Sequence, residues 1–437
     1  MSNPVSDPID PAGAAAQADL DAVANDFRRV APAAVRWVLR LVADTDEVLR
    51  VRRDVLEPPL RGEDRGAYVE ITVPGGQAYG ATCDLSPAGL ARAARQALDQ
   101  ARALSARALL GPPPGPGTPA CGHYRSPVAE PWEALSLEER ITLVRDACRA
   151  LDRASGIVDR EAVLVLRHRE TLTVTSDGGA HRQSLRLVRP ALRVTASAGG
   201  QTQRRTGGGA DQPRQGGREV LAAVGFPGDA EHLVEEAVAL VHAPECPRDV
   251  RDLVLDPGQM ALQIHESIGH PLELDRILGD ERNYAGSSFV TLDMFGRYRY
   301  GSELLNVTFA PDIAGEIASC ARDDEGTPAT REHLIRDGVL VRPLGGASSQ
   351  LRAGLPGTGA ARACDWRRPP IDRMANLNLE PGSGSLEDLI AGIERGVYMR
   401  TNRSWSIDDR RNKFQFGCEM GELIADGERR GLVRNPG

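Results

Sequence analysis

Apolar positions in the first half of the chain switch repeatedly between helical spacing and strict alternation, which predicts a mixture of helices and strands. The predicted elements are, in order, helix passing into strand at 22–49, strands at 48–55 and 68–73, helices at 85–110 and 136–151, strands at 162–174 and 185–196, and a helix at 230–242. The last two strands are joined by a glycine turn rather than by a helix. We therefore expect an α+β fold with mainly antiparallel pairing.

The second half is predicted to open with a strand at 252–255 and a helix whose core face carries Met260, Ile264 and Ile268 at four-residue steps. Beyond that helix we expect helix, turn and strand over 330–343, a flexible Gly/Ser stretch at 345–359, a short helix at 386–396 and a strand at 412–424. The predicted organisation is a disordered tail (1–20), an N-terminal domain (21–242), a linker (243–250) and a C-terminal domain (251–437).

Composition narrows the classes of protein that the chain can belong to. A chain of 437 residues with 41% hydrophobic and 26% charged residues is an ordinary globular protein, and its net charge of −8 does not favour a nucleic-acid partner. Lys413 is the single lysine, so a P-loop is excluded. The seven cysteines form no C-x-x-C pair, and no apolar run is long enough to span a membrane. We expect a cytoplasmic protein that does not bind a membrane.

Metal-binding chemistry is concentrated in one stretch, His265-Glu266-Ser267-Ile268-Gly269-His270. Two neutral imidazoles can ligate a divalent metal, while Glu266, not itself a ligand, takes a proton from a metal-bound water. The alternative interpretation is one histidine at a helix end beside another in the core. The pattern predicts His265 and His270 as metal ligands and Glu266 as the catalytic base.

The spacing of the two histidines requires an irregular turn. They are five residues apart, which on a regular helix places them about 140° apart around the axis. Both rings can meet one metal if the turn widens to i→i+5 pairing, as in a π-bulge, or breaks. Gly269, which tolerates unusual dihedrals, and Pro271, which has no amide donor, favour such a distortion. Beyond the motif, Asp275 could orient an imidazole, although a surface carboxylate is the simpler interpretation.

A stretch rich in Gly, Gln and Arg lies between the predicted domains, at 199–217. It could be a mobile cationic flap that holds a peptide carboxylate, but its composition favours a solvated loop.

The motif and its surroundings resemble a known family. H-E-S-I-G-H-P-L-E-L-D at 265–275, after a V-L-D-P-G turn, is similar to the TldD/PmbA family of metallopeptidases, also called modulators of DNA gyrase. Three further stretches look like that family, at 175–179, 370–382 and 414–419. The resemblance covers nearly the whole chain from about residue 20 and is to the catalytic branch, which keeps the two histidines and the glutamate.

The resemblance implies Zn²⁺ held by His265 and His270, with Glu266 as general base in the hydrolysis of small or unfolded peptides. It also implies an N-terminal α/β-type domain, a C-terminal metallopeptidase domain built on antiparallel sheet that carries the metal-site helix, and a dimer. The dimer would be a homodimer or a heterodimer with a paralogue that lacks the motif.

One feature departs from the family pattern. The family's third metal ligand is a Cys in a Cys-Gly-Lys type motif near the C-terminus, and no such motif is present. We therefore expect the chain to be incomplete at its C-terminus. Cys418 alternates with aromatic positions and is interpreted as a core residue. The rival function is a non-catalytic regulatory or scaffolding subunit with a degenerate metal site, and a thiol hydrolase based on Cys418 is a more distant alternative.

Overall fold

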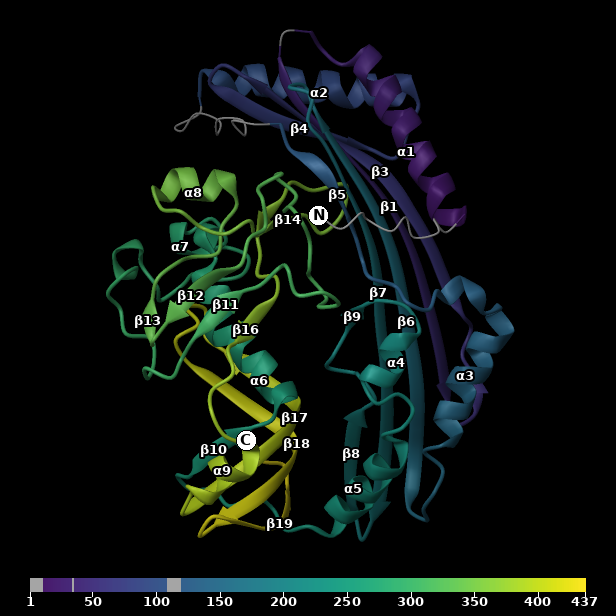
Figure 1. Cartoon of the computed structure of the whole chain (residues 1–437), viewed down its shortest axis with the longest axis vertical. Coiled ribbons are helices and arrows are strands. Elements are labelled where there is room, and N and C mark those ends of the chain that lie inside the picture. Colours follow the sequence, from purple (N-terminus) through teal and green to yellow (C-terminus); the bar gives the residue numbers. More distant parts are fainter. Residues whose placement is uncertain (1–10, 34, 108–118) are drawn as a thin grey trace, which may run out of the picture.

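The computed structural model describes residues 11–33, 35–107 and 119–437. Its N-terminal half is built on one tall, curved sheet, and the C-terminal half packs against one face of that sheet (Figure 1). The strands of the sheet run in the order β4-β3-β1-β6-β7-β5, with β2 on β1 and with β8 and β9 on β7. They are β1 (Arg36–Arg52), β2 (Val55–Leu56), β3 (Leu60–Val73), β4 (Gly76–Thr82), β5 (Cys121–Arg125), β6 (Ile157–Thr175), β7 (Ala180–Ala198), β8 (Gln201–Gly207) and β9 (Arg214–Gln215).

Helices cover this sheet at two places and bury two separate cores. At the upper end in Figure 1, α1 (Pro11–Val30) and α2 (Pro87–Ser105) pack on one face against Leu39, Leu41 and their neighbours. Lower down, α3 (Leu137–Arg149) and α5 (Ala230–His242) belong to a second core. Local signals in the sequence determine where these helices begin, because Ser86 caps α2 and a capping box of Ser136 and Glu139 caps α3.

The expected disordered tail at residues 1–20 is wrong in its second half. Residues 1–10 lie outside the described residues, but α1 begins at Pro11 and Leu20 is buried in the first core. Four alanines between residues 14 and 18 favour the helix, and a proline is tolerated in its first turn.

Two smaller sheets form the C-terminal half. One has the order β10-β17-β18-β19 and the other β13-β12-β11-β16. Their strands are β10 (Asp252–Leu255), β11 (Val307–Phe309), β12 (Glu332–Arg336), β13 (Val339–Leu340), β16 (Leu377–Leu379), β17 (Arg395–Ile407), β18 (Phe414–Ala425) and β19 (Glu428–Arg434). All of these pairs are antiparallel except β10 with β17. The α+β fold class with a C-terminal half built on antiparallel sheet is therefore confirmed.

Other short elements complete the described chain. They are α4 (Glu219–Ala223), α6 (Pro257–Ile264), α7 (Leu274–Leu278), α8 (Ala347–Ala353), α9 (Leu386–Ala391), β14 (Ala361–Arg362), β15 (Ile371–Asp372) and four short helical turns at 132–134, 265–269, 270–272 and 292–294. Two predictions fail here. The helix expected in 330–338 is the strand β12, because pairing with β11 decides its conformation, and the flexible stretch 345–359 contains α8.

A buried ion-pair network joins the two halves, and part of it comes from residues 199–217. The prediction of a solvated loop for this stretch is therefore wrong. Much of that stretch is β8, and Arg205 on β8 is 1% exposed. Its Nε donates to Glu236 on α5 at 2.8 Å, and its Nη1 donates to Glu419 on β18 at 3.1 Å. Arg400 donates to Glu236 at 2.7 Å. Each of these charges has a partner, so the network fastens β8 to β18.

A second contact between the halves lies higher on the sheet. The indole of Trp366 packs on Gly66 of β3, where a Cβ atom would come 2.2 Å from the ring. Its Nε1 donates to Asp64 at 3.0 Å. The segment expected as a linker, 243–250, is itself held by β19, because the Cys246 N–H donates to the Arg434 carbonyl and the Arg434 N–H donates to the Pro244 carbonyl.

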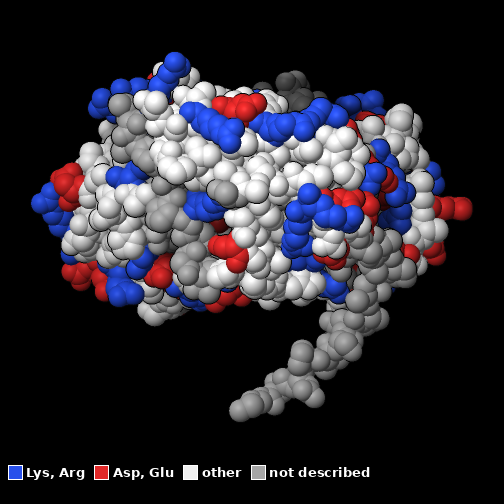
Figure 2. All heavy atoms as spheres, turned by 90° about the horizontal axis from the view of Figure 1, so that it is seen from above, with Lys and Arg blue, Asp and Glu red and all other residues white. Residues whose placement is uncertain are grey.

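The surface carries both signs of charge. On the face shown in Figure 2, arginines and carboxylates lie next to one another with uncharged surface between them. Among the described residues, no helix is both long and apolar enough to cross a bilayer.

Candidate metal centre

The motif lies at the end of α6, where the helix changes its hydrogen-bonding pattern. Asp256 caps α6 by accepting from the Gln259 backbone N–H at 2.8 Å. From His265 to Gly269 the turn is of the π type, and the backbone N–H of His270 donates to the carbonyl of His265. A tight 3₁₀ turn, His270–Leu272, follows. The widened turn predicted from the histidine spacing is confirmed.

Side-chain packing around the turn explains why it widens at this position. Gly269 has ordinary helical dihedrals (φ −57°, ψ −67°), so its role is space rather than conformational freedom. A Cβ atom there would come 2.6 Å from the sulfur of Met374. Pro271 has no N–H to offer to the carbonyl of Ser267, and the hydroxyl of Tyr300 donates to that carbonyl instead. Ile264 and Ile268 face the core, as predicted.

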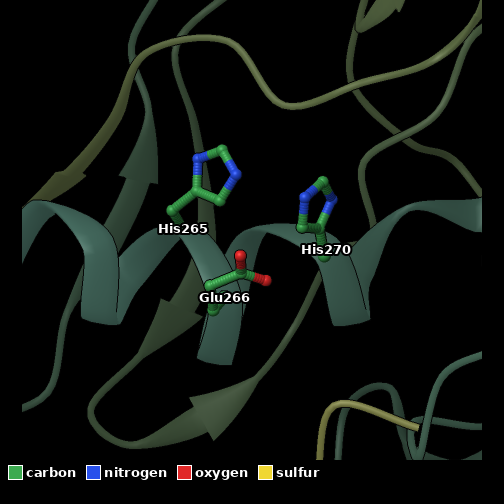
Figure 3. A group of neighbouring side chains, drawn as sticks. All are labelled: His265, Glu266 and His270. Carbon is green, nitrogen blue, oxygen red and sulfur yellow. The ribbon is translucent and has the colours of Figure 1, made fainter. Parts of the chain in front are cut away.

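The turn brings the three predicted site residues together. Each of His265, Glu266 and His270 offers a donor atom within 4.8 Å of the others. The two imidazole centroids are 4.7 Å apart with their planes at 85°. In Figure 3 both rings rise on the same side of the helix and the Glu266 carboxylate lies between them. His265 reaches the surface, whereas Glu266 is 8% exposed.

Glu273 fixes the orientation of one imidazole. Its carboxylate lies 3.0 Å from Nδ1 of His270, so the other ring nitrogen, Nε2, is left to face the site. Glu273 is fully buried and also accepts from Arg276 at 3.1 Å and from the Met374 backbone at 3.2 Å. Burial raises the pKa of Glu273, but the hydrogen bond from His270 and the nearby arginines outweigh it and lower the pKa overall. An ionised Glu273 accepts the Nδ1 proton and thereby selects the tautomer that can ligate a metal through Nε2.

Asp275 does not have either role that the sequence suggested. It is 7% exposed, so it is not a surface carboxylate, and its side chain accepts from the Asp372 backbone at 3.2 Å rather than from an imidazole. Asp372 accepts in return from the Asp275 backbone at 3.0 Å. Burial, with Asp372 close by, raises the pKa of Asp275 to about 8. This exchange ties the segment after the motif to β15.

Two residues of the site escaped the sequence argument. Glu273 stands three residues after His270, and that helical spacing was the available signal. Arg411, in the loop between β17 and β18, lies 3.8 Å from the Glu266 carboxylate, and nothing in the sequence connects positions so far apart. Its guanidinium forms an ion pair with the carboxylate proposed as the general base.

The donor set suits a divalent metal with nitrogen ligands. Although His265 reaches solvent, desolvation of its ring and the neighbouring His270 lower its pKa, which favours the neutral imidazole that ligates metals. Cys418 belongs to neither group of metal-binding side chains found among the described residues. It is 1% exposed in the core, with its sulfur 3.1 Å from Gln259, so its interpretation as a core residue is confirmed.

Comparison with known proteins finds one family. The sequence profile of the PmbA/TldA metallopeptidase C-terminal domain matches residues 249–436, and that of PmbA/TldA metallopeptidase domain 1 matches residues 37–101. A metalloprotease of Methanothermobacter thermautotrophicus is 29% identical over 72% of this chain and 66% of its own length. A zinc metalloprotease TldD homolog of Saccharolobus solfataricus is 28% identical over 42% of this chain and 40% of its own length. The match therefore spans less than two thirds of each relative.

Solved structures share the fold at low identity. A candidate modulator of a DNA gyrase from Thermotoga maritima superposes with a TM-score of 0.73 at 15% identity, covering 95% of this chain and 90% of that one. TldE from Thermococcus kodakarensis gives 0.67 at 17% identity, covering 95% and 89%. The fold is thus found across nearly the whole chain.

Proposed function

Because this chain belongs to the PmbA/TldD family of metallopeptidases, we propose that it is a zinc-dependent peptidase that hydrolyses small or unfolded peptides. The observation that carries the proposal is the π turn, which gathers two imidazoles and a shielded carboxylate on one side of a single helix. A structural metal site has no use for a carboxylate that is not a ligand, whereas hydrolysis requires a base at that place.

The residues of the candidate metal centre have distinct proposed roles in metal binding and proton transfer. His265 and His270 would hold zinc, which when bound polarises a peptide carbonyl and makes water more acidic. Glu266 removes the proton from the attacking water and delivers it to the departing amine, so the proton stays within the site. Arg411 lies beside Glu266 as its ion-pair partner, and Glu273 keeps the His270 ring in place.

The test replaces the base and keeps its shape. Glu266→Gln is expected to retain zinc at the wild-type stoichiometry and to hydrolyse a fluorescently labelled unstructured peptide about 10²-fold to 10⁴-fold more slowly. The control is Glu303→Gln, whose side chain is 83% exposed and which should be as active as wild type. If Glu266→Gln and wild type hydrolysed the peptide at equal rates, Glu266 would not be the catalytic base.

The contact between Glu273 and His270 can be tested separately, by measuring zinc affinity. Glu273→Gln can still accept one hydrogen bond but carries no charge, and zinc affinity measured by competition with a chelator should fall by about tenfold to a hundredfold. Unchanged affinity would mean that the contact with His270 does not support the metal site.

The rival function is a regulatory or scaffolding subunit with a degenerate metal site. It is supported by the lack of a third nitrogen or sulfur ligand beside His265 and His270 among the described residues. Stoichiometric zinc in a wild-type chain that cleaves no member of a peptide library would favour this rival.

We further propose a dimer, either of two copies or with a paralogue that lacks the motif. Exposed aromatic side chains on β17 and β18 support it, since Trp405 is 57% exposed and Phe414 is 55% exposed. Sedimentation of wild type and Trp405→Ser tests it, and a wild-type monomer at micromolar concentration would oppose it.

The seven unpaired cysteines support a cytoplasmic location.

A further inference from the structure

One buried arginine, Arg40, lacks the partners that a buried charge requires. It stands on β1 between Leu39 and Leu41, which point into the first core, so its own side chain lies on the opposite face of the sheet. On that face its register partner is Tyr68 of β3, and the guanidinium carbon lies 4.8 Å from the centre of the Tyr68 ring. Arg40 is 1% exposed.

The hydrogen bonds of Arg40 account for only one of its three nitrogens. Nη2 donates to the backbone carbonyls of Asp365 at 3.2 Å and Arg368 at 2.7 Å. Nε and Nη1 are buried and have no hydrogen-bond partner among the described residues. No carboxylate of the described chain forms an ion pair with this guanidinium. A buried cation without a counter-ion destabilises the fold, because its lost hydration is not replaced.

Arg40 contributes to the wall of a cavity of about 480 Å³ between the sheet and the C-terminal half. The sheet side is formed by β1, β3 and β4, and the opposite side by residues 322–328, the start of α8 and Pro370. In Figure 1 this region lies below α2, next to β14 and α8. Val38 and Tyr68 give the cavity apolar surface. Its volume and its mixture of apolar and polar walls are those of a small-molecule site.

The acidic groups of the cavity do not neutralise Arg40. Glu70, the register partner of Val38, accepts instead from the Tyr68 hydroxyl at 3.1 Å and from Gln77 at 2.7 Å. Burial raises the pKa of Glu70, which favours its uncharged form. Glu325, on the opposite side, accepts from the Ser348 hydroxyl at 2.9 Å. Arg40 therefore has no ion-pair partner within the described chain, and Nε and Nη1 have no acceptor there.

We propose that this cavity binds the free carboxylate of an amino acid or short peptide, with the carboxylate on the unpartnered nitrogens of Arg40. Arg36 and Arg322 line the cavity together with Asp324 and Glu325, so further positive charge is balanced there by carboxyl groups. These carboxyl groups repel a doubly charged phosphate more strongly than a singly charged carboxylate, which favours the carboxylate. The apolar surface accommodates the side chain of such a ligand. This site uses none of the residues of the metal centre, so the proposal does not depend on the proposed function.

The test is calorimetric titration of the full chain with L-leucine and with L-leucinol, which carries an alcohol in place of the carboxylate. Neither probe contains a peptide bond, so neither is consumed by hydrolysis. L-leucine is expected to bind at least tenfold more tightly than L-leucinol. Equal affinity of the two probes, or no binding of L-leucine at millimolar concentration, would overturn the proposal.

Three variants locate the binding. Arg40→Met should reduce L-leucine affinity at least tenfold, and Arg40→Lys, which keeps the charge without the planar group, should reduce it less. Arg167→Met, a loss of an exposed arginine from the same sheet, should bind as wild type does. Thermal unfolding of each variant checks that it is folded. L-leucine binding that survives Arg40→Met and disappears in His265→Ala would assign the ligand to the metal centre and contradict this site.

Discussion

Arg205 and Arg40 are both 1% exposed and both lie where the N-terminal sheet meets the C-terminal half, yet their surroundings differ. Arg205 is enclosed by carboxylates, since it donates to Glu236 and Glu419. Arg40 meets two backbone carbonyls and an aromatic ring, with a cavity beside it. Burial alone therefore does not distinguish an arginine that holds domains together from one that is available to a ligand.

The difference lies in whether the protein itself supplies the opposite charge. Around Arg205 each carboxylate has further donors, because Thr206 donates to Glu419 from its backbone and its hydroxyl, both at 2.8 Å. Such a closed network fixes one arrangement of β8, α5 and β18. Around Arg40, Nε and Nη1 have no hydrogen-bond partner among the described residues, and the residue lines a cavity, as expected for a side chain that binds a ligand.

The largest expected effect is the loss of Arg205. Arg205→Met leaves Glu236 and Glu419 buried with fewer positive neighbours, and the free energy of unfolding should fall by about 3 to 5 kcal/mol. Urea denaturation at pH 7 measures it. Arg204 also donates to Glu419, at 3.1 Å. A loss below about 1 kcal/mol would mean that Arg204 and Arg400 compensate fully, and the contrast with Arg40 would disappear.

A smaller effect is expected when one carboxylate of that network is neutralised. Burial raises the pKa of Glu236, but Arg205 and Arg400 outweigh it and hold the folded pKa below the ordinary 4.5. A depressed folded pKa adds stability above the unfolded pKa, and that stability is lost as the pH falls through the folded value. Glu236→Gln should therefore cost about 2 kcal/mol at pH 7. Its deficit relative to wild type should shrink steadily below about pH 4.5 in urea denaturation from pH 6 to pH 3. A deficit independent of pH would contradict this assignment.

A still smaller effect is expected for Arg40 in the absence of ligand. Arg40→Met removes the donor to two backbone carbonyls, but it also removes a buried charge without a counter-ion, and the two effects oppose each other. The free energy of unfolding should change by less than about 1.5 kcal/mol. A loss equal to that of Arg205→Met would show that Arg40 is primarily structural.

The smallest effect serves as the surface reference. The Arg167 side chain is 45% exposed and pairs with Asp46 across β6 and β1. Arg167→Met should cost less than about 1 kcal/mol, because exposed ion pairs contribute little. A greater loss would mean that replacing any arginine of this sheet by methionine is costly. The losses in free energy of unfolding for Arg205→Met and Arg40→Met would then have to be compared with that larger reference value.

Local signals in the sequence predicted much of this fold, and distant contacts account for most of what they missed. The capping box at Ser136 and the glycine turn between β6 and β7 depend on neighbouring residues, and the structure has that turn where it was predicted. The strand β8 was hidden by its Gly, Gln and Arg content, because the partners that bury Arg205 lie at positions 236 and 419. The strand β12 is five residues long, and its pairing with β11 overrides its own preference.

In the candidate site, too, features set by neighbouring residues were predicted and features set by distant contacts were missed. The histidine spacing predicted the widened turn, since the geometry of one helix suffices for that argument. Arg411, by contrast, reaches Glu266 from more than a hundred residues further along the chain. Arg40 has the pattern of an ordinary residue in an alternating strand, and only the tertiary structure shows that its face is buried against a cavity.

The π turn also constrains how this motif can evolve. A helix of regular pitch would bring two histidines together at a separation of four residues, so the two versions of the motif differ by an insertion rather than by a substitution. In this chain two contacts accommodate the additional residue. Gly269 packs against Met374, and the Tyr300 hydroxyl donates to the Ser267 carbonyl, which receives no hydrogen bond from Pro271. A deletion in the turn would have to occur together with changes at those two distant positions. Point mutation alone therefore provides no gradual path between the two motifs, and each lineage is expected to keep the spacing with which it began.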